Sequence, residues 1–88
     1  MKVKFESKFA KDLKKIKDPK VLSRLKKIII HCKTIANLSE INNLKKLQSY
    51  ETFYRIRLGE YRIGIEIQKD TIIFTRFLHR KDIYKFFP

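Results

Sequence analysis

The chain has 88 residues, with 22 Lys and Arg against 9 Asp and Glu, and a net charge of +13 at pH 7. Its 43% hydrophobic content provides enough apolar surface for folding, which excludes a disordered basic tail. A chain of this length forms one domain over residues 1–88 and has no volume for a large internal pocket. We therefore expect it to act from its surface and without a cofactor.

The few cysteine and histidine residues exclude further classes. Cys32 is the only cysteine, so the chain has no internal disulfide and fits a reducing compartment such as the cytoplasm. With only His31 and His79 beside it, a structural zinc site is not expected. The longest aliphatic run covers residues 28–30, which predicts neither a membrane span nor a secretory signal.

The two halves of the chain carry different cations. Residues 1–46 contain 14 basic and 4 acidic residues, and the remaining residues contain 8 and 5. Thirteen of the 16 lysines lie in the first half, whereas five of the six arginines lie in the second. Lysine is a flexible point charge, while arginine grips phosphate oxygens with a planar fork. This division suggests a lysine-rich part that attracts a polyanion and an arginine-rich part that positions it.

The first half predicts a short strand and two helices. Val3 and Phe5 alternate with lysines as in a strand, and Ser7 stands at the N-cap of a helix whose apolar stripe includes Phe9 and Ile16. Asp18-Pro19 ends this helix and begins a second one, which forms a helical hairpin with the first. The second apolar stripe runs from Val21 to Ala36 and includes Cys32, which we expect in the core; His31 lies off the stripe.

The second half changes to the period of two that is typical of strands. Residues 37–49 fit either a helical extension or a loop pinned by leucines. Strands are predicted over 53–58, 61–67 and 71–78, with a type II′ turn at Gly59-Glu60. Residues 82–87 can form one closing helical turn, with Ile83 and Phe87 packed on the sheet. The predicted fold is α+β: an N-terminal strand and a helical hairpin packed on an antiparallel meander, followed by a short C-terminal helix.

The hairpin register places three arginines on one face. A two-residue turn pairs Arg57 with Arg62 and Arg55 with Gly64, while the other face is apolar and suited to burial. The arginine pair costs roughly 0.2–1 kcal/mol, so stability alone does not select it, and an anionic ligand is the better explanation. Gly64 leaves a shallow place where another backbone could approach. The alternative is that Glu66 and other acids neutralise the cluster.

A cation, an imidazole and a phenol follow at the end of the last strand. His79, Arg80 and Tyr84 are predicted to collect at one end of the sheet, where His and Tyr could transfer protons. The alternative is that Tyr84 is a packing anchor and His79 a surface residue. No phosphate-loop motif, no nucleophile with a histidine partner and no acidic cluster for two metals is present.

The segments Tyr54-Arg55-Ile56-Arg57-Leu58-Gly59-Glu60-Tyr61-Arg62-Ile63 and His79-Arg80-Lys81-Asp82-Ile83-Tyr84 resemble the signature of RelE-like toxins. These belong to the RelE/ParE superfamily of type II toxin–antitoxin systems, and the resemblance extends over nearly the whole chain. It implies a microbial ribonuclease type of fold and an endoribonuclease, an mRNA interferase, that cuts messenger RNA in the ribosomal A site without a metal. The 2′-hydroxyl would attack the adjacent phosphate, and the implied catalytic residues are Arg55, Arg57, Arg62, Arg80 and Tyr84.

Many relatives have lysine where this chain has Arg55 and Arg57. Arginine stays protonated, so His79 and Tyr84 are the better candidates for proton transfer. The implied partners are ribosome-bound mRNA, ribosomal RNA and an acidic antitoxin, with a toxin that is monomeric when free.

Two other functions remain open at this point. One is a ParE-like toxin that inhibits gyrase. The other is a non-catalytic RNA-binding module, in which Phe53 and Phe77 would stack on bases.

Overall fold

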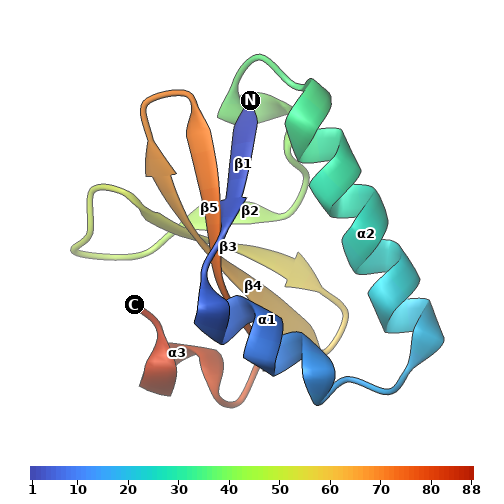
Figure 1. The fold of residues 1–88 in the computed structure, drawn as a ribbon. Helices are drawn as coiled ribbons and strands as arrows, with labels where there is room; N and C mark the ends of the chain where they lie inside the picture. The colour runs from blue at the N-terminus through green and yellow to red at the C-terminus, as the bar shows by residue number, and fades with distance from the viewer.

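The computed structural model describes residues 1–88 and contains the predicted α+β arrangement (Figure 1). Three helices, one 3₁₀ turn and five strands follow one another along the chain. They are β1 (Lys2–Phe5), α1 (Ser7–Lys14), α2 (Pro19–Thr34), the turn η1 (Leu38–Glu40), β2 (Leu44–Lys46), β3 (Phe53–Leu58), β4 (Tyr61–Gln68), β5 (Thr71–His79) and α3 (Ile83–Phe86).

One five-stranded sheet organises the molecule, in the order β1-β5-β4-β3-β2. The predicted meander β3-β4-β5 forms its antiparallel centre, and β1 joins β5 in parallel at one edge. β2 pairs antiparallel with β3 at the other edge and comes from the segment left undecided by the sequence. The sheet is therefore mixed: it adds β1 and β2 to the two edges of the predicted three-stranded meander.

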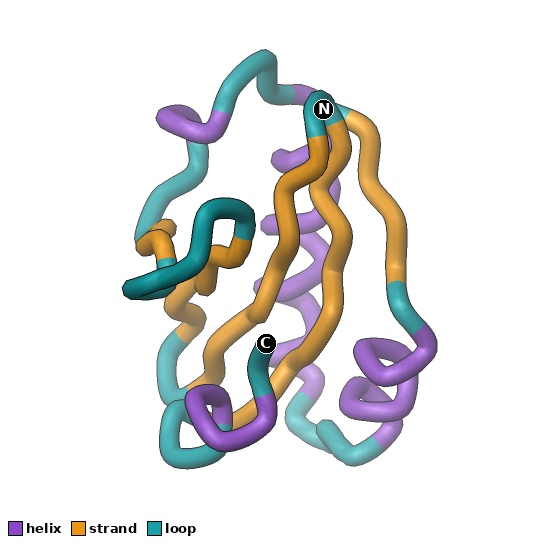
Figure 2. Tube along the Cα trace, turned by 90° about the vertical axis from the view of Figure 1, so that its left-hand side faces the viewer, coloured by secondary structure: helices purple, strands orange, loops and turns teal.

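The two faces of the sheet carry different helices. Figure 2 shows α2 behind the strands and the C-terminal segment in front of them. The main core lies on the α2 side and includes Phe9, Leu25, Cys32, Ile63, Ile65, Phe74 and Phe77. Cys32 is fully buried there, as predicted, and burial raises the pKa of its thiol to about 11.

Helix boundaries differ from the prediction at three places. Glu6, not Ser7, occupies the N-cap of α1 and makes no side-chain capping bond. α1 ends at Lys14, so Ile16 packs from the loop that follows, and Ile35 packs from beyond α2. The Asp18 cap is confirmed, because its side chain accepts a hydrogen bond from the Lys20 amide at 2.9 Å.

A buried carboxylate fixes α1 to the sheet. Asp12 is 4% exposed and accepts hydrogen bonds from Arg76 Nε at 2.8 Å, from an Arg76 terminal nitrogen at 3.1 Å and from the Phe77 amide at 2.9 Å. The hydrogen bond to Asp12 raises the pKa of Arg76, so this guanidinium stays protonated. Three charge-assisted bonds to one carboxylate offset the cost of burying it.

A second, smaller core lies on the opposite face. It contains Leu47, Ile83 and Phe87, with Phe53 and Leu78 packed against it. The predicted packing of Ile83 and Phe87 on the sheet is confirmed, since they are 0% and 4% exposed. This core attaches α3 to the face that carries the predicted arginines.

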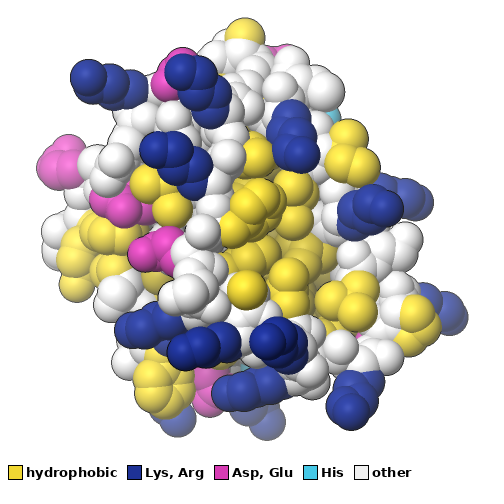
Figure 3. All heavy atoms as spheres, in the orientation of Figure 1, with side chains coloured by type: hydrophobic (Ala, Val, Ile, Leu, Met, Phe, Trp, Pro, Cys, Tyr) yellow, Lys and Arg dark blue, Asp and Glu magenta, His cyan; other side chains and the backbone are white.

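Lysine and arginine side chains are spread around the face seen in Figure 3, and apolar side chains gather between β1 and α2. Phe5 and Ile30, on these two elements, are each about half exposed. No helix in the structure is both long and apolar enough to span a membrane.

Candidate functional site

The β3–β4 hairpin has the predicted register. Arg57 lies opposite Arg62, and Arg55 lies opposite Gly64. Gly59 has a φ of +57° and Glu60 has no positive φ, as a type II′ turn requires. Strand alternation therefore brings Arg55, Arg57 and Arg62 together on the face away from α1 and α2. We call these three residues the arginine cluster.

Arg62 lies at the electrostatic centre of the cluster. One terminal nitrogen donates hydrogen bonds to the Gly59 carbonyl at 2.8 Å and to the Tyr61 carbonyl at 2.9 Å. Burial and then the charge of Arg55 lower the pKa of Arg62; Arg57 and Arg80 lower it further, and Tyr84 raises it. Arg55, Arg57, Arg80 and Tyr84 therefore lie close enough to Arg62 to act on its charge. The guanidinium of Arg62 still remains protonated at neutral pH.

Arg55 and Arg57 are held by Asn43, which the sequence analysis missed. Arg55 donates a hydrogen bond to the Asn43 carbonyl at 2.9 Å, and Arg57 donates one to Asn43 Oδ1 at 3.3 Å. Asn43 has a φ of +64°, a conformation that asparagine adopts more readily than most residues. The Nε atom of Arg55 is buried without a hydrogen-bond acceptor in the protein.

The arginine cluster has no acidic partner. None of its members belongs to a salt bridge in the structure. Glu66 instead accepts a hydrogen bond from Gln68 at 3.1 Å. The alternative in which Glu66 neutralises the arginines is therefore wrong. Three adjacent cations without a counter-charge provide an anion-binding surface.

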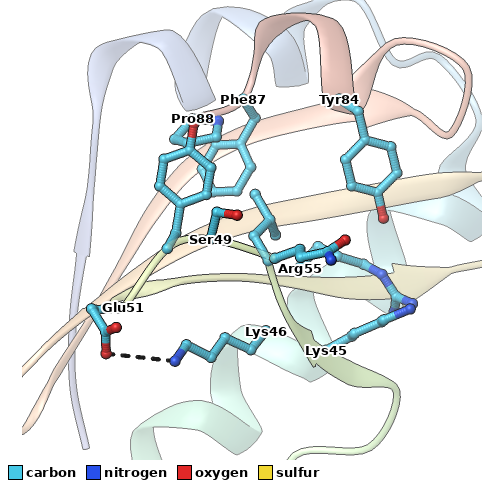
Figure 4. A pocket seen from close by; sticks show the side chains of 11 residues that line it. Lys45, Lys46, Ser49, Glu51, Arg55, Tyr84, Phe87 and Pro88 are labelled. Carbon is cyan, nitrogen blue, oxygen red and sulfur yellow. Dashed lines mark ion pairs between the residues drawn. The ribbon is translucent and has the colours of Figure 1, made fainter.

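A cleft of about 800 Å³ adjoins the cluster. Arg55 and Tyr84 line it together with Lys45 and Lys46 of β2. Lys45 pairs with Arg55 across the β2–β3 ladder and so shares its face. Tyr84 is 63% exposed, and in Figure 4 its hydroxyl points into the cleft, toward the side on which Arg55 and Lys45 lie. Lys45 was missed because a strand of only three residues has no readable alternation.

Gly64 does not provide the predicted open place. A Cβ atom there would lie 2.8 Å from the Phe87 ring, so the space above this glycine is filled by the protein's own C-terminal segment. The glycine permits Phe87 to lie flat on the sheet, and Phe87 in turn holds α3 and Tyr84 beside the arginine cluster.

His79 does not lie with the arginines. It pairs with Tyr61 on the α-helical face of the sheet, and the two rings make an edge contact with centroids 5.9 Å apart. Its Nδ1 accepts a hydrogen bond from the Lys81 amide at 3.1 Å, and its Nε2 lies 3.8 Å from the Glu60 carboxylate. His79 and Tyr84 both lie near the end of β5, as predicted, but not on one face: His79 pairs with Tyr61 on the side of the main core, whereas Tyr84 extends from α3 on the side of the arginine cluster.

Arg80 occupies the rim of the site. Its Nε donates to Glu60 Oε2 at 2.8 Å, and its backbone amide donates to the Glu60 carbonyl at 2.8 Å. Arg80 is thus paired with an acid, unlike the arginine cluster. The charge of Arg80 is the smallest of those that lower the pKa of Arg62.

Comparisons with known proteins identify the family. The family described as ParE toxin of type II toxin–antitoxin system, parDE, matches residues 3–84. Toxin RelE3 of Methanocaldococcus jannaschii is 48% identical over 89 residues and covers all of both chains. The chain belongs to the RelE/ParE family of toxins. It is a RelE-like toxin of the type II class, as the resemblance predicted.

Solved structures of the family share the fold. The RelB–RelE antitoxin–toxin complex from Methanococcus jannaschii contains a chain that is 46% identical, with a TM-score of 0.83 over 97% of this toxin and 99% of that chain. The archaeal RelE–RelB complex from Pyrococcus horikoshii OT3 is similar at 20% identity, with a TM-score of 0.73 over 90% of this toxin and 93% of that chain. At this lower identity the likeness concerns the fold alone.

Proposed function

We propose that this toxin is a ribosome-dependent endoribonuclease that cuts messenger RNA in the A site. The observation that carries the proposal is the arginine cluster, whose three members have no acidic partner and lie beside a cleft that contains Tyr84. Such a surface suits a phosphodiester, because preorganised cations stabilise the charge that develops on the phosphate during cleavage.

The proposed chemistry uses the RNA's own nucleophile. The 2′-hydroxyl loses its proton and attacks the adjacent phosphorus, and the bond to the 5′-oxygen breaks as that oxygen gains a proton. The products are a 2′,3′-cyclic phosphate and a free 5′-hydroxyl. Because the nucleophile is the RNA hydroxyl, the reaction needs no metal to activate a water molecule. No three His, Cys, Asp or Glu side chains lie close enough together to hold a metal ion.

The residues divide into two roles. Arg55, Arg57 and Arg62, with Arg80 at the rim, would bind the scissile phosphate and stabilise its transition state, since guanidinium groups stay charged. Two side chains in the cleft beside Arg55 can exchange a proton with the reacting oxygens: the phenol of Tyr84 and the amine of Lys45. His79, the other candidate from the sequence, faces away from the cluster, and we assign it no proton transfer.

The partners follow from charge and from the relatives. A net charge of +13 favours association with ribosomal RNA in the cytoplasm. The similar RelE chains occur in complexes with the antitoxin RelB. We propose that an acidic antitoxin binds this toxin too, by covering the arginine cluster or displacing the segment around Tyr84. An antitoxin segment could also use the apolar area between β1 and α2 (Figure 3).

One observation favours a second function, the inhibition of gyrase, because the matching family description is that of ParE. The non-catalytic RNA-binding module loses its support. Phe77 is 1% exposed in the main core, and Phe53 packs edge-on against Phe87, so neither provides the open stacking face that was expected.

The deciding experiment is induced expression followed by mapping of RNA 5′ ends on translated messages. A ribonuclease produces codon-linked ends that vanish when translation initiation is blocked. A gyrase inhibitor produces DNA breaks and no such ends. Ends that persist on untranslated RNA would refute ribosome dependence.

A further inference from the structure

One wall of the cleft is not used by the proposed reaction. The loop between β2 and β3 contributes Leu47, Gln48, Ser49, Tyr50 and Glu51 to it, opposite the wall formed by Tyr84 and Phe87. The cleft volume of about 800 Å³ is within the range of sites that hold a ligand the size of a nucleotide. It therefore has room for more than the phosphate.

Tyr50 provides an exposed aromatic ring in this wall. It is 45% exposed and packs at 90° against Phe53, with ring centroids 5.7 Å apart. Phe53 in turn packs against Phe87 at 5.6 Å, which connects Tyr50 to the smaller core. The Tyr50 hydroxyl makes no hydrogen bond within the protein, and the preceding Ser49 has a φ of +71°, an uncommon conformation for a residue other than glycine.

The cleft combines this ring with cations. Lys45, Lys46 and Arg55 oppose a single acid, Glu51, which is 95% exposed and lies 3.7 Å from the Lys46 ammonium. Proteins bind single-stranded nucleic acids with this combination: cations follow the phosphates, and aromatic rings stack on the bases. The Gln48 amide and the Ser49 hydroxyl add donors and acceptors that can read the edge of a base.

We propose that Tyr50 stacks on a base of single-stranded RNA next to the phosphate bound by Arg55, and that the wall from Gln48 to Glu51 selects which base is accepted. This inference rests on the proposed function and adds its sequence preference. A cleft that combines cations with an aromatic ring beside the reaction centre favours a nucleobase over a protein segment. The three cations would repel a basic peptide, and an acidic peptide would have no base to stack on the exposed ring.

The test is single-turnover cleavage on ribosomes programmed with messages that differ only in the A-site codon. Tyr50→Ala should lower kcat/KM at the preferred codons by about 10- to 100-fold and flatten the preference, since stacking contributes this much per base. Tyr50→Phe should retain the parental profile. Lys46→Gln should weaken cleavage of all codons equally, as the loss of a phosphate contact does. Ser23→Ala changes an exposed side chain on α2 that makes no hydrogen bond, and it should change neither rate nor profile.

Tyr50→Leu separates stacking from packing, because leucine fills the space beside Phe53 without a π face. A folded Leu variant with the flattened profile supports the inference. A Tyr50→Leu or Tyr50→Ala variant that keeps the parental codon preference overturns the inference. A variant whose only defect is weaker antitoxin binding overturns it as well. If the parental toxin cuts no message, the proposed function fails and the base site fails with it. If it cuts and the profile does not depend on Tyr50, only the base site fails.

Discussion

Arg62 offers the sharpest separation of function from stability. It faces Arg57 across the hairpin, and the charges of Arg55, Arg57 and Arg80 all lower its pKa. Its own hydrogen bonds go to the carbonyls of Gly59 and Tyr61 rather than to an acid. The charge of Arg62 is therefore repelled by its neighbours, and its side chain is held in place by hydrogen bonds to two carbonyls.

The effect of Arg62→Gln on stability is a difference of two small contributions. Loss of the repulsion from Arg57 stabilises the fold by roughly 0.2–1 kcal/mol. Loss of hydrogen bonds to carbonyls costs about 1 kcal/mol, because the glutamine amide can still donate to one of them. The net change should therefore stay within about 1 kcal/mol, or within roughly 4–8 °C in Tm for a domain of this size. Cleavage should fall by about 100- to 1000-fold, as it does when a preorganised donor to a developing oxyanion is removed.

Thermal melts and ribosome-dependent cleavage assays on the same preparations measure both quantities. Lys27→Gln on α2 is the matched control, since it removes one positive charge far from the arginine cluster and should change neither Tm nor rate appreciably. Arg62→Lys keeps the charge and loses the planar fork, and it should give an intermediate rate. A variant at Arg62 that melts many degrees lower but cuts at the parental rate would refute the phosphate-binding role.

Four further substitutions or probes test other parts of the structure. Tyr84→Phe should keep the parental Tm and lower the single-turnover cleavage rate by about 100-fold or more, because the hydroxyl makes no hydrogen bond in the protein but is assigned a proton transfer. Gly64→Ala should lower the free energy of unfolding by about 1–3 kcal/mol, measured in urea, because the new methyl group meets the Phe87 ring at 2.8 Å. Asp12→Asn should cost about 3–5 kcal/mol in the same assay, because it leaves the partly buried guanidinium of Arg76 without its counter-charge. Cys32 should resist thiol alkylation at pH 8 in the native protein and react quickly in denaturant, since burial raises its pKa to about 11.

The parts of the fold that were predictable have strong local signals. The Asp18-Pro19 helix start, the Gly59-Glu60 turn and the register around Arg57 and Arg62 each depend on neighbours in sequence, and each is confirmed. β2 was not predicted, because its three residues are too few to show the period of two that marks a strand. The parallel pairing of β1 with β5 joins the two ends of the chain and left no trace in either strand alone.

The candidate site was predictable where it lies on the hairpin and less so elsewhere. The shared face of Arg55, Arg57 and Arg62 follows from alternation within two adjacent strands. The position of His79 depends on how β5 pairs with β4, and this pairing contains a register shift between Gly64 and Ile65. Lys45 and Asn43 reach the site from β2 and the residue before it, so they could not be found without the sheet order.

The smaller core explains why the site needs the end of the chain. On the face of the arginine cluster, three side chains bury one another: Leu47 at the start of the β2–β3 loop, and Ile83 and Phe87 around α3. The loop contributes one wall of the cleft and the segment from Tyr84 to Phe87 contributes the other, so the same apolar contacts that hold α3 also set the width of the cleft. Because these contacts involve only three buried side chains, against twelve in the main core, they are the less costly ones to open. A partner that removes α3 from this face would open the cleft and displace Tyr84 from the arginines while the main core, on the other side of the sheet, stays intact.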